Sequence, residues 1–290
     1  MILFSIGFVS GMKIFKKTGS DIAKGQIENN IPIQGNKDNS GENVDKPQDS
    51  TTPDPNSGDS PQKNDPNSVV TTPNKPSENP SPTDAAPDKK EVFLTFDDGP
   101  TSKVTPRILK ILDDYNVKAT FFVIGKNAEK YPELIKQAQA SGHLIANHTY
   151  SHDYNFIYSS TDNFLIDLEK SNQVLASILG SFDNKIIRFP GGSFGAKRTA
   201  YRDAVTKAGY TYVDWNALNG DAADPKRITI PSAELVQNLK TSVNSVPSKN
   251  KNHVVVLMHD AAAKSTTADS LPEIIEFLKS QGYEFKTLAE

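Results

Sequence analysis

The stretch Val92-Phe-Leu-Thr-Phe-Asp-Asp-Gly-Pro100 decides the fold of this chain, because it joins an uninterrupted apolar run to a polar turn. Residues 92–96 predict a strand that is buried on both faces, as strands are in parallel sheets. The aspartates, the glycine and the proline after it favour a turn. A helical pattern follows, with Thr105 and Pro106 at its expected N-cap and first helical position. The stretch therefore predicts a strand–turn–helix unit with two carboxylates at the turn.

The same unit recurs as far as the C-terminus. Further strands are predicted at residues 119–124, 144–146, 186–189, 210–214, 254–258 and 283–285. Helical patterns separate most of them, at residues 125–139, 164–179, 196–208, 232–243 and 270–279. Consecutive strand–helix units indicate a parallel sheet that is covered by helices. We therefore predict an α/β fold with about seven parallel strands, closed or nearly closed into a (β/α) barrel.

The segment before this region has a different composition. No Phe, Tyr or Trp occurs between Lys16 and Val92, and ten of the nineteen prolines lie between Pro47 and Pro87. Such a segment buries too little apolar surface to offset its chain entropy, so residues 19–90 are predicted to be a disordered Pro/Asn/Ser-rich tether. The folded domain is predicted at residues 91–290, about 200 residues, which is enough for a sizeable core.

The chain begins with an apolar run of about a dozen residues, followed by Lys13, Lys16 and Lys17. The run has no basic residue before it and no clear small-residue cleavage site, and it is shorter than the roughly 20 residues of a membrane span. A frayed apolar tail is one interpretation. We favour a membrane anchor or signal remnant at residues 1–18, with the tether reaching through a cell wall. The domain is then expected outside the cytoplasm, at the cell surface.

Charge and cysteine content argue against several classes of function. A net charge of −3 without a dense Lys/Arg block argues against nucleic acid as a partner. The chain has no cysteine, which excludes disulfides, thiolate catalysis and sulfur-ligated metals. It also lacks a dinucleotide-type Gly-x-Gly-x-x-Gly after any predicted strand. We expect a monomer.

Polar residues gather where the predicted strands end, which is where the active sites of (β/α) barrels lie. The clusters are Asp97-Asp-Gly-Pro100, His148-Thr-Tyr-Ser-His152, Arg188-Phe-Pro-Gly-Gly-Ser193, Asp214-Trp-Asn216 and Met258-His-Asp260. The two other histidines, His143 and His253, precede their strands and are predicted to be structural or solvated.

The spacing of His148 and His152 allows both imidazoles to face one ion on a helical turn, with a carboxylate from another strand completing the set. Two histidines and an aspartate suit Zn²⁺ or another first-row divalent ion in a hydrolytic site. Alone, the pair is weak evidence, because surface or capping histidines also show this spacing. Its place at a strand end, together with Asp98 and a third histidine, favours a metal site.

In order and spacing these motifs resemble the five motifs of the NodB-homology polysaccharide deacetylases, the family-4 carbohydrate esterases. The motifs are Thr95-Phe-Asp-Asp-Gly-Pro100, His148-Thr-Tyr-Ser-His152, Arg188-Phe-Pro-Gly-Gly-Ser193, Asp214-Trp-Asn216 and Leu257-Met-His-Asp260. The resemblance covers about residues 91–290. It implies a distorted (β/α) barrel, a divalent metal that is usually zinc, with cobalt as a second candidate, and removal of N- or O-acetyl groups from sugars.

The resemblance also implies the role of each residue at the chemical centre. Asp97 matches the catalytic base of the family, and His259 matches its general acid. Asp98, His148 and His152 match the metal ligands. This division agrees with amide hydrolysis, in which a base takes a proton from water and an acid protonates the leaving amine.

Around this centre, Arg188 and Asp214 match a pair that holds the base and the acid in place. Trp215 and Leu257 match walls of the pocket for the acetyl methyl group. Gly191 stands where many relatives have Tyr. Its backbone N–H can still face the developing oxyanion, but any wall that the Tyr ring supplied is missing.

Two other classes of protein fit these motifs less well. A glycoside hydrolase needs its carboxyls roughly 5–9 Å apart across a sugar ring, whereas neighbours such as Asp97 and Asp98 face different directions. A non-catalytic wall-glycan-binding module would tolerate the loss of Asp97 or His259, and neither is lost. We expect N-acetylglucosamine of peptidoglycan as the substrate. Chitin oligosaccharides, another surface polysaccharide and an acetylxylan ester stay open, because loops determine specificity.

Overall fold

The structure is a computed structural model, which describes residues 89–224 and 226–289. The predicted anchor at residues 1–18, and the tether as far as residue 88, lie outside the described residues. Within the described ranges, no helix is long and apolar enough to cross a membrane.

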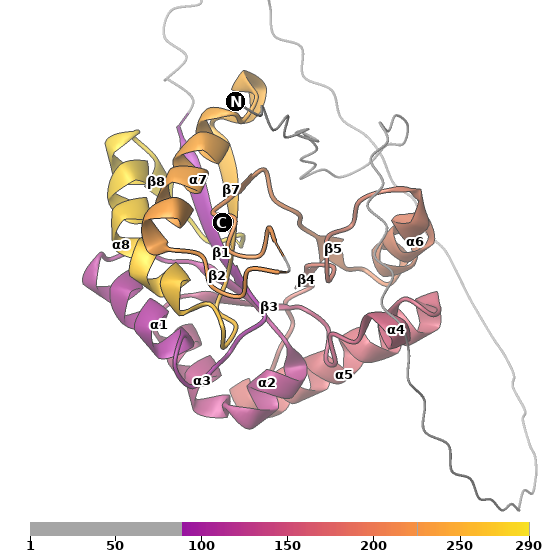
Figure 1. The fold of residues 1–290 in the computed structure, drawn as a ribbon. Coiled ribbons are helices and arrows are strands. Elements are labelled where there is room, and N and C mark those ends of the chain that lie inside the picture. Colours follow the sequence, from indigo (N-terminus) through magenta and orange to yellow (C-terminus); the bar gives the residue numbers. More distant parts are fainter. Residues whose placement is uncertain (1–88, 225, 290) are drawn as a thin grey trace, which may run out of the picture. The chain divides into compact units, whose positions relative to one another are not determined.

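Eight strands form one sheet in which every pair is parallel (Figure 1). They are β1 (Glu91–Asp97), β2 (Thr120–Val123), β3 (Leu144–Asn147), β4 (Ile186–Ile187), β5 (Thr211–Tyr212), β6 (Ala217–Leu218), β7 (His253–His259) and β8 (Glu284–Phe285). The order is β5-β4-β3-β2-β1-β7-β6, and β8 pairs with β1 off this path. In the described part of the chain no pairing joins β5 to β6, so the sheet is a curled half-barrel rather than a closed ring.

Helices cover the outer face of the sheet (Figure 1). They are α1 (Thr105–Asp114), α2 (Gly125–Lys130), α3 (Pro132–Ala140), α4 (Tyr154–Ile157), α5 (Thr161–Leu179), α6 (Thr199–Lys207), α7 (Ser232–Asn244) and α8 (Ser265–Ser280). The largest core packs Ile108 of α1, Leu239 of α7 and Ile274 of α8 against strand residues such as Leu94 and Val256. Burial of these apolar faces, at about 25 cal/mol per Å², is the main stabilising term.

Strand alternation determines which side chains point into the half-barrel. Leu94 belongs to the core beneath the helices, whereas Phe93 belongs to a second cluster on the opposite face, together with Val255 of β7. Side chains alternate between faces with a period of two. Asp97 therefore shares the inner face with Phe93, and His259 shares it with Val255. The register pairs Asp97 directly with His259, so these two residues lie next to each other at the ends of the central strands.

The predicted α/β class and all seven predicted strands are confirmed. The structure adds β6, whose two residues are too few to form a recognisable pattern, and the short α4. The helix predicted at 125–139 is two helices, because Pro132 begins a new one. Thr105 is not an N-cap. Its hydroxyl instead donates to Asp260 Oδ2 at 2.6 Å.

Candidate active site

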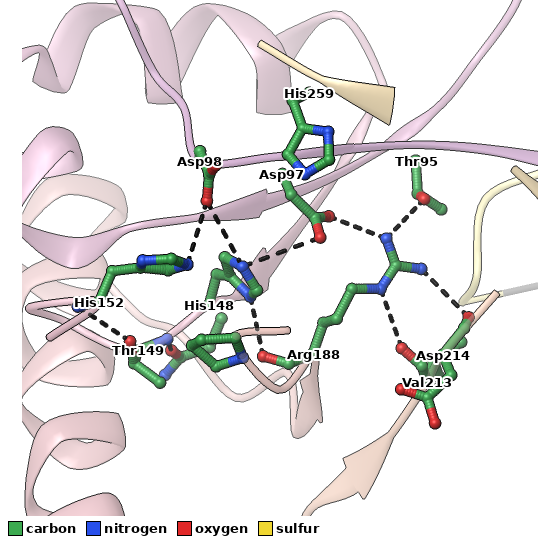
Figure 2. Close-up of polar contacts among 12 residues, drawn as sticks. Thr95, Asp97, Asp98, His148, Thr149, His152, Arg188, Val213, Asp214 and His259 are labelled. Atoms are coloured by element: carbon green, nitrogen blue, oxygen red, sulfur yellow. Dashed lines mark hydrogen bonds and ion pairs between the residues drawn. The ribbon is translucent and has the colours of Figure 1, made fainter. Parts of the chain in front are cut away.

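Asp97 ends β1, and a buried arginine holds its carboxylate in place (Figure 2). Arg188, which follows β4, is 0% exposed. Its Nη1 donates to Asp97 Oδ1 at 2.8 Å and to Thr95 Oγ1 at 2.6 Å. Its Nε and Nη2 donate to the carbonyls of Val213 at 3.0 Å and Asp214 at 3.3 Å. A buried guanidinium is tolerated only when it is paired and hydrogen-bonded, so this network determines where Asp97 lies.

Asp98, His148 and His152, which we call the ligand group, gather beside Asp97 (Figure 2). Asp98 Oδ1 lies 3.6 Å from His148 Nε2 and 3.3 Å from His152 Nε2. Asp97 Oδ2 is 3.8 Å from His148 Nε2. Asp98 Oδ1 is buried and has no hydrogen-bond partner among the described residues. An unpaired buried carboxylate oxygen is costly, and a cation would satisfy it. One carboxylate and two imidazoles fit a first-row divalent ion such as Zn²⁺.

His148 is prepared for such a role by its surroundings. Its Nδ1 lies 2.8 Å from the carbonyl oxygen of Arg188, so Nδ1–H donates there and the lone pair of Nε2 faces the ligand group. Burial lowers the pKa of the His148 imidazole and outweighs the carboxylates of Asp97 and Asp98, which raise it. The neutral imidazole is the form that binds metals.

The two histidines do not lie on a helical turn, which corrects the sequence-based expectation. They belong to the loop between β3 and α4, in which Thr149 and His152 have φ values of 68° and 53°. Asn147 Oδ1 accepts from the Thr149 N–H at 2.7 Å, and Asp167 Oδ1 accepts from the next two backbone N–H groups at 2.7 and 2.9 Å. These side chains stabilise a left-handed backbone that a β-branched residue rarely adopts.

The turn that holds Asp98 is also tightly constrained. Asp98 has a φ of 75°, and its carbonyl accepts from Asn127 Nδ2 at 2.8 Å. A Cβ on Gly99 would lie 2.0 Å from Asp260 Oδ2, so glycine is required there while Asp260 keeps its place. Burial raises the pKa of the Asp260 carboxyl to about 7, and Thr105 Oγ1 donates to it. The buried Asp260 therefore supports the backbone that presents Asp98.

His259 is oriented by Asp221, a residue that the sequence reasoning missed. Its Nδ1 lies 2.7 Å from Asp221 Oδ1, and Asp221 Oδ2 accepts from the His259 N–H at 2.8 Å and from Thr267 Oγ1 at 2.7 Å. Burial lowers the pKa of His259, but the hydrogen bond and the charge of Asp221 outweigh it. With Asp97 and Asp98 adding to the effect, the pKa rises to about 9. The only sequence signal for Asp221 is an acidic residue shortly after the unpredicted β6.

In the described part of the chain, no hydrogen bond or ion pair joins Asp214 to His259. The expectation that Arg188 and Asp214 together hold base and acid is therefore wrong for the acid, which Asp221 holds. Asp214 Oδ1 accepts from the Ser193 N–H at 2.9 Å, and Oδ2 accepts from the Ser193 hydroxyl. Burial raises the pKa of Asp214, against the hydrogen bonds from Ser193. Asp214 lies two residues after the end of β5 and reaches the turn after β4, whereas His259 ends a strand on the other side of β1. The expectation for Arg188 and Asp97 agrees with the geometry.

The predicted pocket residues lie around this centre. Gly191 has a φ of 74°, a backbone conformation that favours glycine. Trp215 packs against the inner cluster, and the ring of Phe194 meets its indole edge-on at 5.3 Å. Leu257 lies two residues before His259 on the inner face of β7 and is 9% exposed. His143, predicted to be structural, accepts at Nδ1 from the Ala119 N–H at 3.2 Å.

Comparisons with known proteins agree with this geometry. Residues 84–213 match the family model described as polysaccharide deacetylase. A peptidoglycan-N-acetylglucosamine deacetylase of Bacillus cereus is 32% identical over 207 residues, which cover 70% of this chain and 71% of that protein. A Streptococcus mutans CE4 esterase is 34% identical with a TM-score of 0.63, covering 69% of this chain and 86% of that chain. The catalytic domain of a peptidoglycan N-acetylglucosamine deacetylase from Eubacterium rectale is 39% identical with a TM-score of 0.61. The match covers 70% of this chain and 90% of that chain.

Fold, site and similarities together define a class, the metal-dependent hydrolases that cleave amide carbon–nitrogen bonds in polysaccharides. Within that class, the chain belongs to the polysaccharide deacetylase family, as the NodB-homology motifs had predicted.

Proposed function

We propose that this protein removes the acetyl group from N-acetylglucosamine in peptidoglycan. The observation that supports the chemistry best is the pairing of Asp97 with His259 in register, beside the ligand group. The similarity to proteins from Bacillus cereus and Eubacterium rectale that are named peptidoglycan N-acetylglucosamine deacetylases supports the substrate.

A divalent cation, zinc or alternatively cobalt, would be held by Asp98, His148 and His152. When bound, such a cation polarises the acetyl carbonyl and makes a coordinated water more acidic. The fit rests on the unpaired Asp98 Oδ1 and on the orientation of His148.

The side chains around the ligand group divide the proton transfers. Arg188 occupies Asp97 Oδ1, which leaves Oδ2 to take a proton from the attacking water. His259, whose pKa is raised to about 9, is protonated at neutral pH and donates to the leaving nitrogen. The backbone N–H of Gly191 would face the developing oxyanion, as the resemblance to the family implies. The carbon–nitrogen bond breaks, acetate is released, and the sugar keeps a free amine.

Related substrates would use the same groups. A solved Xyl-CE4 domain of a multidomain xylanase is 29% identical with a TM-score of 0.57, which keeps an acetylxylan ester among the candidates. Chitin oligosaccharides differ from peptidoglycan glycan only outside the acetylated sugar itself.

Mass spectrometry of purified substrate tests the proposal. The full chain is incubated with peptidoglycan, chitin oligosaccharide or acetylxylan, with and without a chelator. We expect loss of acetyl groups from peptidoglycan, no reaction after chelation, and recovery when Zn²⁺ or Co²⁺ is added. Full activity in protein shown to be metal-free by elemental analysis would contradict the role of the ligand group. Binding without turnover on all three substrates would favour a wall-binding module.

We also propose that the protein acts as a monomer outside the cytoplasm, at the cell surface or wall. The proposed substrate and the composition of residues 1–90 support this placement. Protease treatment of intact cells tests it, because a protein inside the membrane would stay protected.

A further inference from the structure

Tyr154 is the first residue of α4 and stands at the edge of the ligand group. Its ring meets the His152 imidazole edge-on, with centroids 5.4 Å apart, and meets the Tyr158 ring edge-on at 5.7 Å. It is nevertheless 46% exposed. A large aromatic ring is therefore half open to solvent beside a residue that we expect to bind the metal.

The hydroxyl of Tyr154 lies above Gly191. A Cβ built on Gly191 would be 2.9 Å from the hydroxyl oxygen and 3.3 Å from a ring carbon of Tyr154. The absence of a side chain at Gly191 therefore makes room for the tip of a tyrosine from another element. The sequence-based expectation was that the pocket lacks the wall that a Tyr ring supplies at position 191. The ring of Tyr154, which comes from α4, lies next to this position instead.

Among the described residues, the hydroxyl groups of two neighbouring tyrosines form hydrogen bonds within the fold, unlike the hydroxyl of Tyr154. The Tyr158 hydroxyl donates to the Pro190 carbonyl at 2.7 Å, and the Tyr201 hydroxyl donates to the Tyr158 carbonyl at 2.7 Å. The Arg198 guanidinium lies 3.3 Å from the Tyr158 ring centroid. In the described ranges of the chain no hydrogen bond is formed by the Tyr154 hydroxyl. Tyr158, which is held in place by these contacts, therefore orients the ring of Tyr154, whose hydroxyl is free to donate a hydrogen bond.

We propose that Tyr154 contacts the substrate, and that its hydroxyl donates a hydrogen bond to the acetylated sugar bound at the ligand group. This inference rests on the proposed function. Sugars present many acceptor oxygens, and a tyrosine combines an apolar ring with a polar tip that suits such a ligand. Because the hydroxyl lies over Gly191, we place its contact on the sugar that carries the acetyl group.

The test measures binding separately from turnover. The probe is tetra-N-acetylchitotetraose, titrated calorimetrically into the zinc-loaded full chain with Asp97→Asn, which blocks proton transfer. Adding Tyr154→Phe should raise the Kd about 3- to 10-fold, as expected for the loss of one hydrogen bond. In the wild-type background Tyr154→Phe should raise KM by a similar factor and change kcat little. Tyr115→Phe is the matched control, because its hydroxyl bonds Glu276 at a remote site between α1 and α8.

Gly191→Ala supplies a second variant, since its methyl group would displace the hydroxyl. Once Gly191→Ala is present, adding Tyr154→Phe should change Kd little, so the effects of the two substitutions on Kd should be strongly non-additive. The backbone strain of Ala at a positive φ is present with and without Tyr154→Phe, so it cancels in this comparison.

The proposal is overturned if Tyr154→Phe leaves Kd and KM unchanged, or if the two substitutions are additive. It is also overturned if elemental analysis shows that Tyr154→Phe loses zinc, since the residue would then act through His152. A wild-type chain that neither binds nor deacetylates the oligosaccharide or peptidoglycan would instead contradict the proposed function.

Discussion

Asp97 and Asp98 are neighbours in the chain but face different partners. Strand alternation turns Asp97 toward Arg188 on the inner face, and a left-handed φ of 75° turns Asp98 toward the two histidines. The same residue type can therefore serve as proton acceptor in one position and as metal ligand in the next.

This division predicts separable effects of substitution. Asp97→Asn and His259→Ala should keep the metal and lose about 10²- to 10⁴-fold in kcat, the usual contribution of acid–base catalysis. His148→Ala should lose the metal itself. His259→Ala should impair an O-acetyl ester less than an amide, because the ester has the better leaving group. Elemental analysis and steady-state kinetics check these outcomes, and loss of metal from Asp97→Asn would show that Asp97 is a ligand.

The pair of His259 and Asp221 predicts a pH dependence. His259 acts in its protonated form, so kcat/KM should fall as pH rises through the pKa of about 9. Asp221→Asn removes the charge that raises this pKa, while burial still lowers it, so the alkaline limb should move to lower pH. Asp214→Asn is the control, because it removes a carboxylate that contacts Ser193 and should leave the limb in place. An unchanged limb in Asp221→Asn would contradict the assignment of His259 as acid.

At the scale of elements, the central strands position the acid and the base, and the loops after them position the metal ligands. The seven-residue register of β1 with β7 places Asp97 opposite His259 by backbone pairing alone. The ligand group instead depends on turns that Asn147, Asp167 and Asp260 stabilise from neighbouring elements.

The turn after β1 predicts a strong effect of one methyl group. Gly99→Ala should destabilise the fold by about 1–3 kcal/mol or more, because the Cβ would overlap the Asp260 carboxylate. Combining it with Asp260→Ala should recover part of the loss by making room. Thermal unfolding of the single and double variants measures this, and equal losses in both backgrounds would show that the contact is not the cause.

At the scale of the molecule, composition separates the N-terminal segment from the folded domain. No Phe, Tyr or Trp occurs between Lys16 and Val92, so most of this segment offers little to a core. Removing residues 1–88 should therefore leave Tm and turnover of soluble oligosaccharide nearly unchanged. Differential scanning calorimetry of the full and shortened chains is the check, and a large drop in Tm would show that this segment supports the domain.

The sequence by itself determined the class of fold and most of the centre. Apolar runs, helical spacing and the polar clusters at strand ends are local patterns, and parallel strands bring their carboxyl ends to one edge of the sheet. Asp97, Asp98, His148, His152, Arg188 and His259 were all predicted in this way, and they gather as expected.

Only the tertiary structure decided which carboxylate supports His259 and what lies over Gly191. Asp221 reaches His259 across 38 residues of sequence, and Tyr154 covers Gly191 from a helix too short to predict. Both contacts depend on how loops pack between elements, and local sequence does not encode the direction in which a loop side chain points. Strand alternation is a property of the backbone, whereas these contacts are properties of packing.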